Sequence, residues 1–228
     1  MQTIRGILFD KDGTLFDFQA TWGAWARALI AELAQGDPVR ERAMAQAMAF
    51  DLESGRFLPE SPVIAGTGRE VAELLAPILA VSADTLEARI ASAAASAPLA
   101  QAVPLRPLLQ RLRDAGLQLG VATNDFEAVA RSHLHDVLDL FDFVAGFDSG
   151  HGGKPAPGML LAFARACNLD PQTVLMVGDS RHDLQAGRAA GMATLAVLTG
   201  VATAADLADL ADAVRPDIGH LPELLALL

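Results

Sequence analysis

The chain has 228 residues, of which 52% are hydrophobic, and its 28 acidic and 17 basic side chains give a formal net charge of −11. This length allows a sizeable buried core, whereas the negative charge argues against nucleic acid or an anionic membrane as the main partner, because both require basic surfaces. The N-terminus lacks a signal-peptide pattern, no run of about 18 apolar residues predicts a membrane span, and the single Cys167 excludes an internal disulfide, so we expect a cytoplasmic protein.

An apolar run of strand length, residues 4–9, opens the chain and ends at the sequence Asp10-Lys11-Asp12-Gly13-Thr14. Residues 18–96 then have the pattern of successive helices rich in Ala, Leu and Glu, with breaks at 36–38, 58–62 and 81–82. No strand is predicted among these helices.

From residue 105 onward, helical and strand patterns alternate. The predicted order is helix 105–115, strand 117–122, helix 126–138, strand 143–146, helix 158–167, strand 174–177, a helix ending at Gly191 and strand 194–198, with a short helix, an extended segment and an amphipathic turn in 204–228. Such alternation predicts a parallel sheet with right-handed crossovers. We therefore predict an α/β fold with a Rossmann-like parallel sheet core, residues 1–16 and 100–228, and an inserted all-helical domain, residues 17–99.

Two pairs of carboxylates follow two of the predicted strands. Asp10 and Asp12 follow the first strand, and Asp179 and Asp183 follow the strand 174–177. Open α/β sheets bind ligands at the carboxyl ends of their strands, so we expect both pairs to meet in one crevice. Acids gathered there suit metal-assisted phosphoryl transfer, because an anionic phosphate ester can meet a carboxylate only beside a cation. For Asp183, an acid that complements the dipole of the next helix is an open alternative.

Three further residues favour the same chemistry. Thr123 and Asn124 follow the strand 117–122, where a hydroxyl can donate to a phosphoryl oxygen. Lys154, within Gly152-Gly153-Lys154-Pro155, would offset the crowded acids, and an ordinary solvated lysine is the alternative. The glycines beside it do not form a Walker loop, because a proline follows the lysine.

The aromatic and histidine residues carry a weaker signal. Trp22 and Trp25 are three residues apart on one predicted helix face, which is more typical of core packing than of ligand contact. None of the histidines has metalloprotease spacing, so we predict surface or structural roles for His133, His135, His151, His182 and His220.

The segments 10–15, 123–124, 154–155 and 178–180 with Asp183 resemble, in this order, the four motifs of the haloacid dehalogenase-like hydrolases. The closest resemblance is to the phosphoglycolate phosphatase-like branch, whose helical cap lies between the first two motifs. It implies a nucleophilic Asp10 that forms an aspartyl phosphate, and Asp12 as general acid and then base. The implied roles of the remaining residues are phosphate binding by Thr123, Asn124 and Lys154, Mg²⁺ binding by Asp10, the backbone carbonyl of Asp12 and Asp179, and support of that site by Asp183.

The resemblance predicts a Mg²⁺-dependent phosphomonoester hydrolase, a monomer or homodimer that acts on a small phosphorylated metabolite. A phosphoglycolate-like compound is one option. A phosphosugar mutase of the same superfamily is an alternative, because residues 65–70 resemble a mutase cap loop. A noncatalytic binding module on the same fold is a further alternative, against which the intact acids argue.

Arg69 is a candidate specificity residue in the predicted cap. Thr67 can cap a helix running towards Leu79, and the Arg69 guanidinium at its start suits a carboxylate or second phosphate of the substrate. The alternative is a glycine-rich helix start with an exposed arginine.

Overall fold

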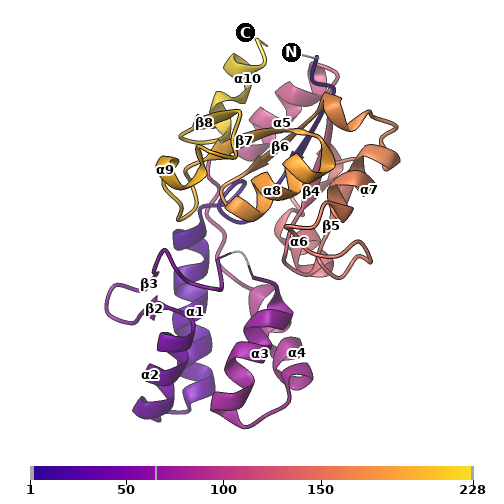
Figure 1. Ribbon diagram of the computed structural model, residues 1–228. Coiled ribbons are helices and arrows are strands. Elements are labelled where there is room, and N and C mark those ends of the chain that lie inside the picture. Colours follow the sequence, from indigo (N-terminus) through magenta and orange to yellow (C-terminus); the bar gives the residue numbers. More distant parts are fainter. Residues whose placement is uncertain (1–2, 65, 227–228) are drawn as a thin grey trace.

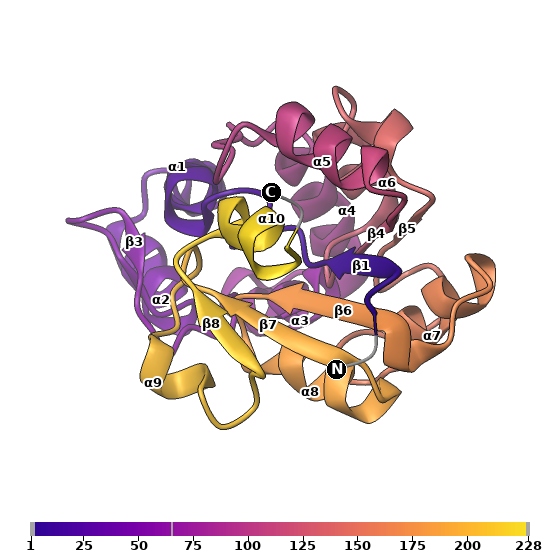
Figure 2. The ribbon, with the colours of Figure 1, turned by 90° about the horizontal axis from the view of Figure 1, so that it is seen from above.

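A computed structural model of the protein describes residues 3–64 and 66–226. Within these residues, six parallel strands form one sheet in the order β5-β4-β1-β6-β7-β8 (Figure 2). Their bounds are β1 Gly6–Phe9, β4 Gln118–Ala122, β5 Phe143–Ala145, β6 Val174–Gly178, β7 Ala193–Val197 and β8 Ala213–Arg215. The predicted parallel sheet is confirmed.

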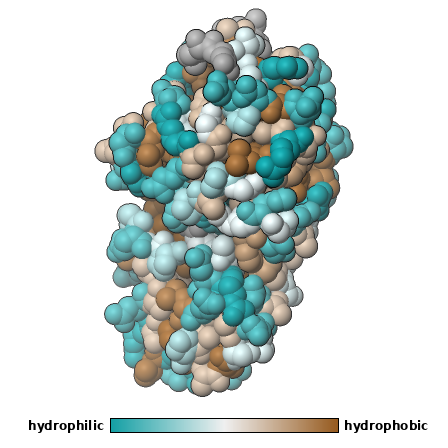
Figure 3. All heavy atoms as spheres, turned by 45° about the vertical axis from the view of Figure 1, so that its right-hand side comes forward, coloured by the Kyte–Doolittle hydropathy of each residue, from teal (hydrophilic) through white to brown (hydrophobic). Residues whose placement is uncertain are grey.

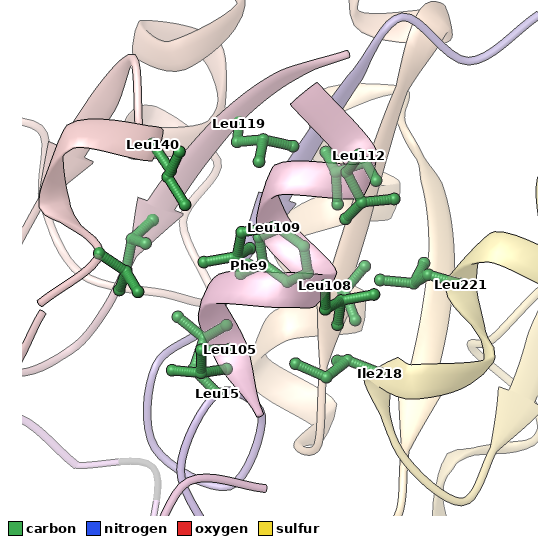
Figure 4. Packing of buried hydrophobic residues seen from close by; sticks show 14 of the residues in the cluster. Phe9, Leu15, Leu105, Leu108, Leu109, Leu112, Leu119, Leu140, Ile218 and Leu221 are labelled. Carbon is green, nitrogen blue, oxygen red and sulfur yellow. The ribbon is translucent and has the colours of Figure 1, made fainter. Parts of the chain in front are cut away.

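Successive residues of β1 face opposite sides of the sheet, and both sides are buried. Ile7 and Phe9 pack with α5 (Leu105–Asp114), α6 (Glu127–His133) and α10 (Leu221–Leu224), and Figure 4 shows Leu109 of α5 beside Phe9. Leu8 packs on the other side with α7 (Gly158–Ala166) and α8 (Arg181–Ala190). A strand covered on both faces is expected to be apolar throughout, which is why residues 6–9 do not alternate with polar residues.

Residues between β1 and β4 form a second layer of helices with its own hydrophobic core, below the sheet in Figure 1. These helices are α1 Phe18–Ala34, α2 Pro38–Ala47, α3 Gly68–Leu79 and α4 Ala83–Ala94. A capping side chain starts each one, namely Asp17, Asp37, Thr67 and Ser82 in turn. The breaks predicted at 36–38 and 81–82 therefore correspond to real helix ends.

The two connections between the layers run side by side. The Asp17 amide donates to the Ala100 carbonyl at 2.8 Å, and Phe16 pairs with Gln101 in an isolated bridge. The predicted boundaries at 16/17 and 99/100 lie at this crossing, and the division into two domains stays a prediction. We call residues 17–99 the helical insertion.

A short hairpin interrupts the helical insertion, and the sequence pattern did not predict it. Strand β2 (Phe50–Asp51) pairs antiparallel with β3 (Arg56–Phe57), and the Asp51 carboxylate holds the turn by accepting from the Glu53 amide and the Ser54 hydroxyl. Two-residue strands are too short to display an alternating pattern. Among the described residues of the insertion, the regular elements are therefore four helices and this hairpin.

The predicted helix 126–138 is shorter than expected. Helix α6 ends at His133, and a 3₁₀ turn follows at Leu138–Leu140. Leu134, Val137 and Leu140 are buried at intervals of three, which suits a tighter turn than an α-helix. The remaining short elements are the helix α9 (Ala204–Leu207) and the 3₁₀ turns Pro171–Thr173 and Ile218–His220.

The outer surface is of mixed character. On the face shown in Figure 3, hydrophilic side chains are interspersed with hydrophobic ones over both layers. Among the described residues, no helix combines the length and the apolar character that crossing a bilayer requires.

Candidate active site

The candidate site lies at the carboxyl ends of the three adjacent strands β4, β1 and β6. Asp10 follows β1, Thr123 follows β4 and Asp179 follows β6, so three segments far apart in sequence meet at one edge of the sheet. A pocket lies between this edge and helices α1, α3 and α4. The sheet side of the pocket is lined by Asp10, Asp12, Thr123, Asn124, Asp125, Phe126, Lys154, Ser180, His182 and Asp183.

A buried lysine bridges two of the acids. Lys154 Nζ donates to Asp10 Oδ1 at 2.5 Å and to Asp183 Oδ1 at 2.6 Å, and these side chains are at most 10% exposed. Burial raises the pKa of Asp10 to about 7; Lys154 opposes that rise, while Asp183 and Asp12 add to it. Burial alone would lower the pKa of Lys154, but Asp10 and Asp183 more than compensate and keep the ammonium charged.

Asp179 lies against two glycines. A β-carbon at Gly13 or Gly200 would collide with its carboxylate, and Gly13 also has a φ of +84°, which disfavours other residues. Burial, together with the charges of Asp10 and Asp183, raises the pKa of Asp179 well above its usual value. The local backbone is thus shaped to bring a third acid close to the other two despite their repulsion.

The three carboxylates are close enough to share a cation. One carboxylate oxygen each from Asp10, Asp179 and Asp183 lies within 4.8 Å of the others, and all three residues are buried. Asp183 is fixed by further contacts, since its Oδ2 accepts from the Ser180 amide at 3.0 Å and the Ser180 hydroxyl at 2.6 Å. This capping box at the start of α8 explains how Asp183 serves the helix and the cluster at once.

Asn124 holds the backbone of Lys154 through two hydrogen bonds. Its side-chain amide donates to the Lys154 carbonyl at 3.0 Å, and its side-chain oxygen accepts from the Lys154 amide at 2.8 Å. The Thr123 hydroxyl accepts from the Asp125 amide at 3.1 Å. Both residues line the pocket, and the contacts made by Asn124 position the backbone of Lys154.

A second buried lysine, to which the sequence analysis assigned no role, holds Asp12. Lys11 Nζ lies 2.8 Å from Asp12 Oδ2, 3.0 Å from Asp125 Oδ2 and 3.0 Å from His133 Nδ1. It also lies 5.2 Å from the centre of the Trp22 ring. Burial lowers the pKa of Lys11, but the two carboxylates reverse the effect and raise it above the usual value.

His133 links this lysine to the helical insertion. Its Nε2 lies 2.8 Å from the Ala94 carbonyl of α4, and a carbonyl can only accept, so Nε2 carries the proton and Nδ1 accepts from Lys11. Burial, and then the charge of Lys11, lowers the pKa of His133. The structural role predicted for this histidine matches its neutral, buried position. His182, by contrast, lines the pocket.

The helical insertion supplies an apolar wall opposite the acids. The residues of this wall are Phe18, Trp22, Trp25, Val63, Ile64, Gly66, Gly68, Val71, Ile90 and Ala94. The Trp22 and Trp25 rings pack edge to face with their centres 5.1 Å apart. Both residues belong to the hydrophobic core of the insertion and also line the pocket.

Arg69 contacts acids of α3 and α4. Its guanidinium pairs with Glu73 at 2.8 Å, with Glu87 at 3.1 Å and with Asp84, and it does not belong to the pocket lining. These contacts favour the alternative of a helix-start arginine, and a specificity role stays a prediction. Thr67 does cap α3, as predicted, whereas Ala65 of the loop 65–70 lies outside the described residues.

Two curated proteins with sequences similar to this chain are both phosphoglycolate phosphatases. The chain is 37% identical over 120 residues to the phosphoglycolate phosphatase of Neisseria meningitidis, covering 51% of each chain. It is 39% identical over 95 residues to the phosphoglycolate phosphatase of Escherichia coli K12, covering 40% of this chain and 37% of that one. The chain thus matches about half the length, or less, of these curated relatives.

Solved structures share the fold at low identity. A haloacid dehalogenase family hydrolase from Deinococcus radiodurans, with bound phosphate and sodium, has a TM-score of 0.69 at 22% identity and covers 99% of this chain and 96% of that one. The family model described as haloacid dehalogenase-like hydrolase matches residues 4–191, which include the acids of both pairs. The chain therefore belongs to the haloacid dehalogenase-like hydrolases.

Proposed function

We propose that the protein is a Mg²⁺-dependent phosphomonoesterase that acts on a small phosphorylated metabolite through Asp10. The observation that supports this most is the buried cluster of Asp10, Asp179 and Asp183 around Lys154 at the end of a pocket. Such a cluster is costly to bury without a function, because like charges repel and each carboxylate loses its water.

The donor set fits a hard cation. Carboxylate and carbonyl oxygens are the ligands that Mg²⁺ prefers. We assign binding to Asp10, the Asp12 carbonyl and Asp179, while Asp183 is held by Ser180 and Lys154 and supports the site. When bound, Mg²⁺ would screen the negative charges of the carboxylates and the phosphate.

The protein's own residues divide the remaining work. An ionised Asp10 oxygen attacks phosphorus and forms the aspartyl phosphate, while the ester oxygen leaves with a proton from Asp12. Asp12 then takes a proton from the water that hydrolyses this intermediate. Lys11 holds the Asp12 carboxylate in place, and Asn124 positions Lys154 beside Asp10. We assign the Thr123 hydroxyl to a phosphoryl oxygen.

We also propose that the helical insertion acts as a cap over a catalytic core formed by residues 1–16 and 100–228. The separate hydrophobic clusters of the two layers, and the pocket between them, support this division. A cap that closes on the substrate would exclude bulk water from the acids.

The test is phosphate release from a panel of phosphomonoesters, with Mg²⁺ and with excess chelator. We expect Mg²⁺-dependent release from at least one alkyl phosphate, and no release in chelator. Release that chelator leaves unchanged would contradict the metal assignment. No release from any ester would contradict phosphatase activity and leave the binding-module alternative.

Sugar-phosphate isomerisation in the same samples tests the mutase alternative. The apolar wall of the insertion disfavours that alternative, because most of the hydroxyls of a sugar buried there would lack hydrogen-bond partners.

A further inference from the structure

The two walls of the pocket have opposite chemical character. The sheet side carries the acids, and the facing wall is built of Phe18, Trp22, Trp25, Val71 and Ile90 of the insertion, with Phe126 beside them. Among the described residues that line the pocket, Lys154 is the only lysine or arginine, and it already bridges Asp10 and Asp183.

The other cationic groups near the described lining are placed or paired elsewhere. His182 lies on the sheet side of the pocket, and Lys11, which is outside the lining and 5.2 Å from the Trp22 ring centre, is paired with Asp12 and Asp125. The arginine nearest in sequence to the lining glycines, Arg69, pairs with Glu73, Asp84 and Glu87 outside the pocket. A carboxylate or second phosphate placed against this wall would lose its hydration without gaining a counter-charge, which is strongly unfavourable.

Trp25 offers a hydrogen bond instead. Trp25 is one of the residues that line the pocket, it is 6% exposed, and among the described residues its buried Nε1 has no acceptor. Leaving a buried N–H unpaired is costly, so a ligand that supplies an acceptor gains affinity there. The Trp22 ring, packed edge to face against Trp25, limits the freedom of the indole.

We propose that the part of the substrate remote from the phosphate is an uncharged, aromatic or apolar group that carries a hydrogen-bond acceptor for the Trp25 indole. This inference rests on the proposed phosphatase function and specifies its substrate class. It disfavours phosphoglycolate, whose remote group is a carboxylate.

The first test compares three alkyl phosphates on the wild-type protein with Mg²⁺: 2-phenylethyl phosphate, ethyl phosphate and phosphoglycolate. All three release an alcohol, so differences in binding are not hidden by an unusually good leaving group. We expect kcat/KM for 2-phenylethyl phosphate to exceed both others by at least about tenfold, the scale of burying one large apolar group. A kcat/KM for phosphoglycolate or ethyl phosphate equal to or above that of 2-phenylethyl phosphate would overturn the inference and leave the phosphatase function standing.

A control substrate separates the two proposals. With 4-nitrophenyl phosphate, whose leaving group needs little assistance, we expect Mg²⁺-dependent release whatever the preference among the alkyl esters. Absence of release from all four compounds would contradict the proposed function itself, and with it the substrate class.

Variants of Trp25 test the wall and the indole separately. Trp25→Ala should lower kcat/KM for 2-phenylethyl phosphate at least about tenfold more than for ethyl phosphate. Equal losses for both substrates would assign Trp25 a structural role and overturn its contact with the substrate. Should the alanine variant fail to fold, the wild-type comparison still decides.

Trp25→Phe keeps an aromatic ring but removes the N–H donor together with the five-membered ring of the indole, so each methoxy substrate is compared with the parent substrate in the same variant. Among the ortho-, meta- and para-methoxy derivatives of 2-phenylethyl phosphate, at least one should have a higher kcat/KM than the parent in the wild type. That gain should disappear in Trp25→Phe. Absence of any gain in the wild type, or its persistence in the variant, would overturn the acceptor part of the inference.

Discussion

The two walls of the pocket differ in how their residues are held. On the sheet side, strand ends and glycine turns fix buried charges within a few ångströms of one another, as for Asp10 and Lys154 at 2.5 Å. On the insertion side, apolar side chains of three helices face the same space without a cation among the described lining residues. The charged wall on the sheet side has groups that could act on the phosphate of any ester. The apolar wall on the insertion side could distinguish esters by the group that carries the phosphate. If the proposed function holds, we expect variants of the charged wall to change the reaction and variants of the apolar wall to change the preference among substrates.

Replacing Asp10, the proposed nucleophile, should have the largest effect on activity. Asp10→Asn is nearly isosteric but cannot attack phosphorus, so we expect Mg²⁺-dependent phosphate release to fall at least about 1,000-fold for every substrate. Circular dichroism should show an unchanged fold. Asp114→Asn, at the exposed end of α5, is the matched control and should retain full activity. Substantial turnover by Asp10→Asn would remove Asp10 from the role of nucleophile.

Removing the bridging cation should destabilise the charged wall. Lys154→Met leaves Asp10 and Asp183 buried without their shared partner, and breaking a buried pair in this way costs about 3–5 kcal/mol of unfolding free energy. The loss should be smaller at pH 6 than at pH 8, because Lys154 stabilises only the ionised form of Asp10, and the wild-type Asp10, whose pKa beside Lys154 is about 7, is largely protonated at pH 6. Urea denaturation at both pH values measures it. An equal loss at both pH values would contradict the link to Asp10.

Arg188→Met is the control for the loss of a lysine or arginine charge, because Arg188 pairs with Asp212 at the surface and contacts none of the three clustered acids. Surface pairs contribute little, so this variant should be much less affected than Lys154→Met. Added Mg²⁺ should restore part of the stability lost in Lys154→Met, since a bound cation also compensates the carboxylates.

Asp179 tests the metal assignment. Asp179→Asn should weaken Mg²⁺ binding at least about tenfold, with activity partly recovered at high metal concentration. A calorimetric titration of Mg²⁺ against wild type, Asp179→Asn and the surface variant Asp209→Asn measures the difference. A titration that is the same in all three would exclude Asp179 from the ligands.

The charged wall was predictable from the sequence because its signals are local. Asp10 and Asp179 each follow an apolar run of strand length, and the parallel sheet that aligns those strands follows from the alternation of helices and strands. Lys11 gave no such signal. Its partners Asp125 and His133 lie more than 110 residues away, and the parallel pairing of β1 with β4 brings them together.

The apolar wall was only partly predictable. The spacing of Trp22 and Trp25 indicates one helix face, but a face that packs in a core and a face that lines a pocket have the same periodicity. Which of them a ligand can reach depends on how α1 sits over the sheet, and this arrangement comes from contacts between distant segments.

His133 contacts both Lys11 on the sheet side and the Ala94 carbonyl of the insertion. Its protonation should make the stability of the protein depend on pH. A buried neutral histidine resists protonation, so below pH 6.5 the unfolded chain binds the proton more readily and the free energy of unfolding falls. His133→Gln keeps a donor and an acceptor but does not titrate. We expect the fall in stability between about pH 7.5 and pH 5.5 to be smaller in this variant by about 1 kcal/mol. His135→Gln, at an exposed position, is the control and should behave as wild type. An unchanged pH dependence in His133→Gln would contradict the neutral state of His133.

The smallest effect is expected at Arg69. Its guanidinium already pairs with carboxylates of α3 and α4 and does not line the pocket, so Arg69→Ala should change kcat/KM for 2-phenylethyl phosphate and phosphoglycolate by less than about twofold. Arg89→Ala, which removes a similar pair with Glu32 at 2.6 Å, is the matched control. Suppose instead that Arg69→Ala lowered kcat/KM for phosphoglycolate about tenfold or more and spared 4-nitrophenyl phosphate. Arg69 would then reach the substrate when the insertion closes over the core. The apolar wall of the insertion would carry a positive charge in that closed state, and the contrast between the two walls would hold only for the open pocket.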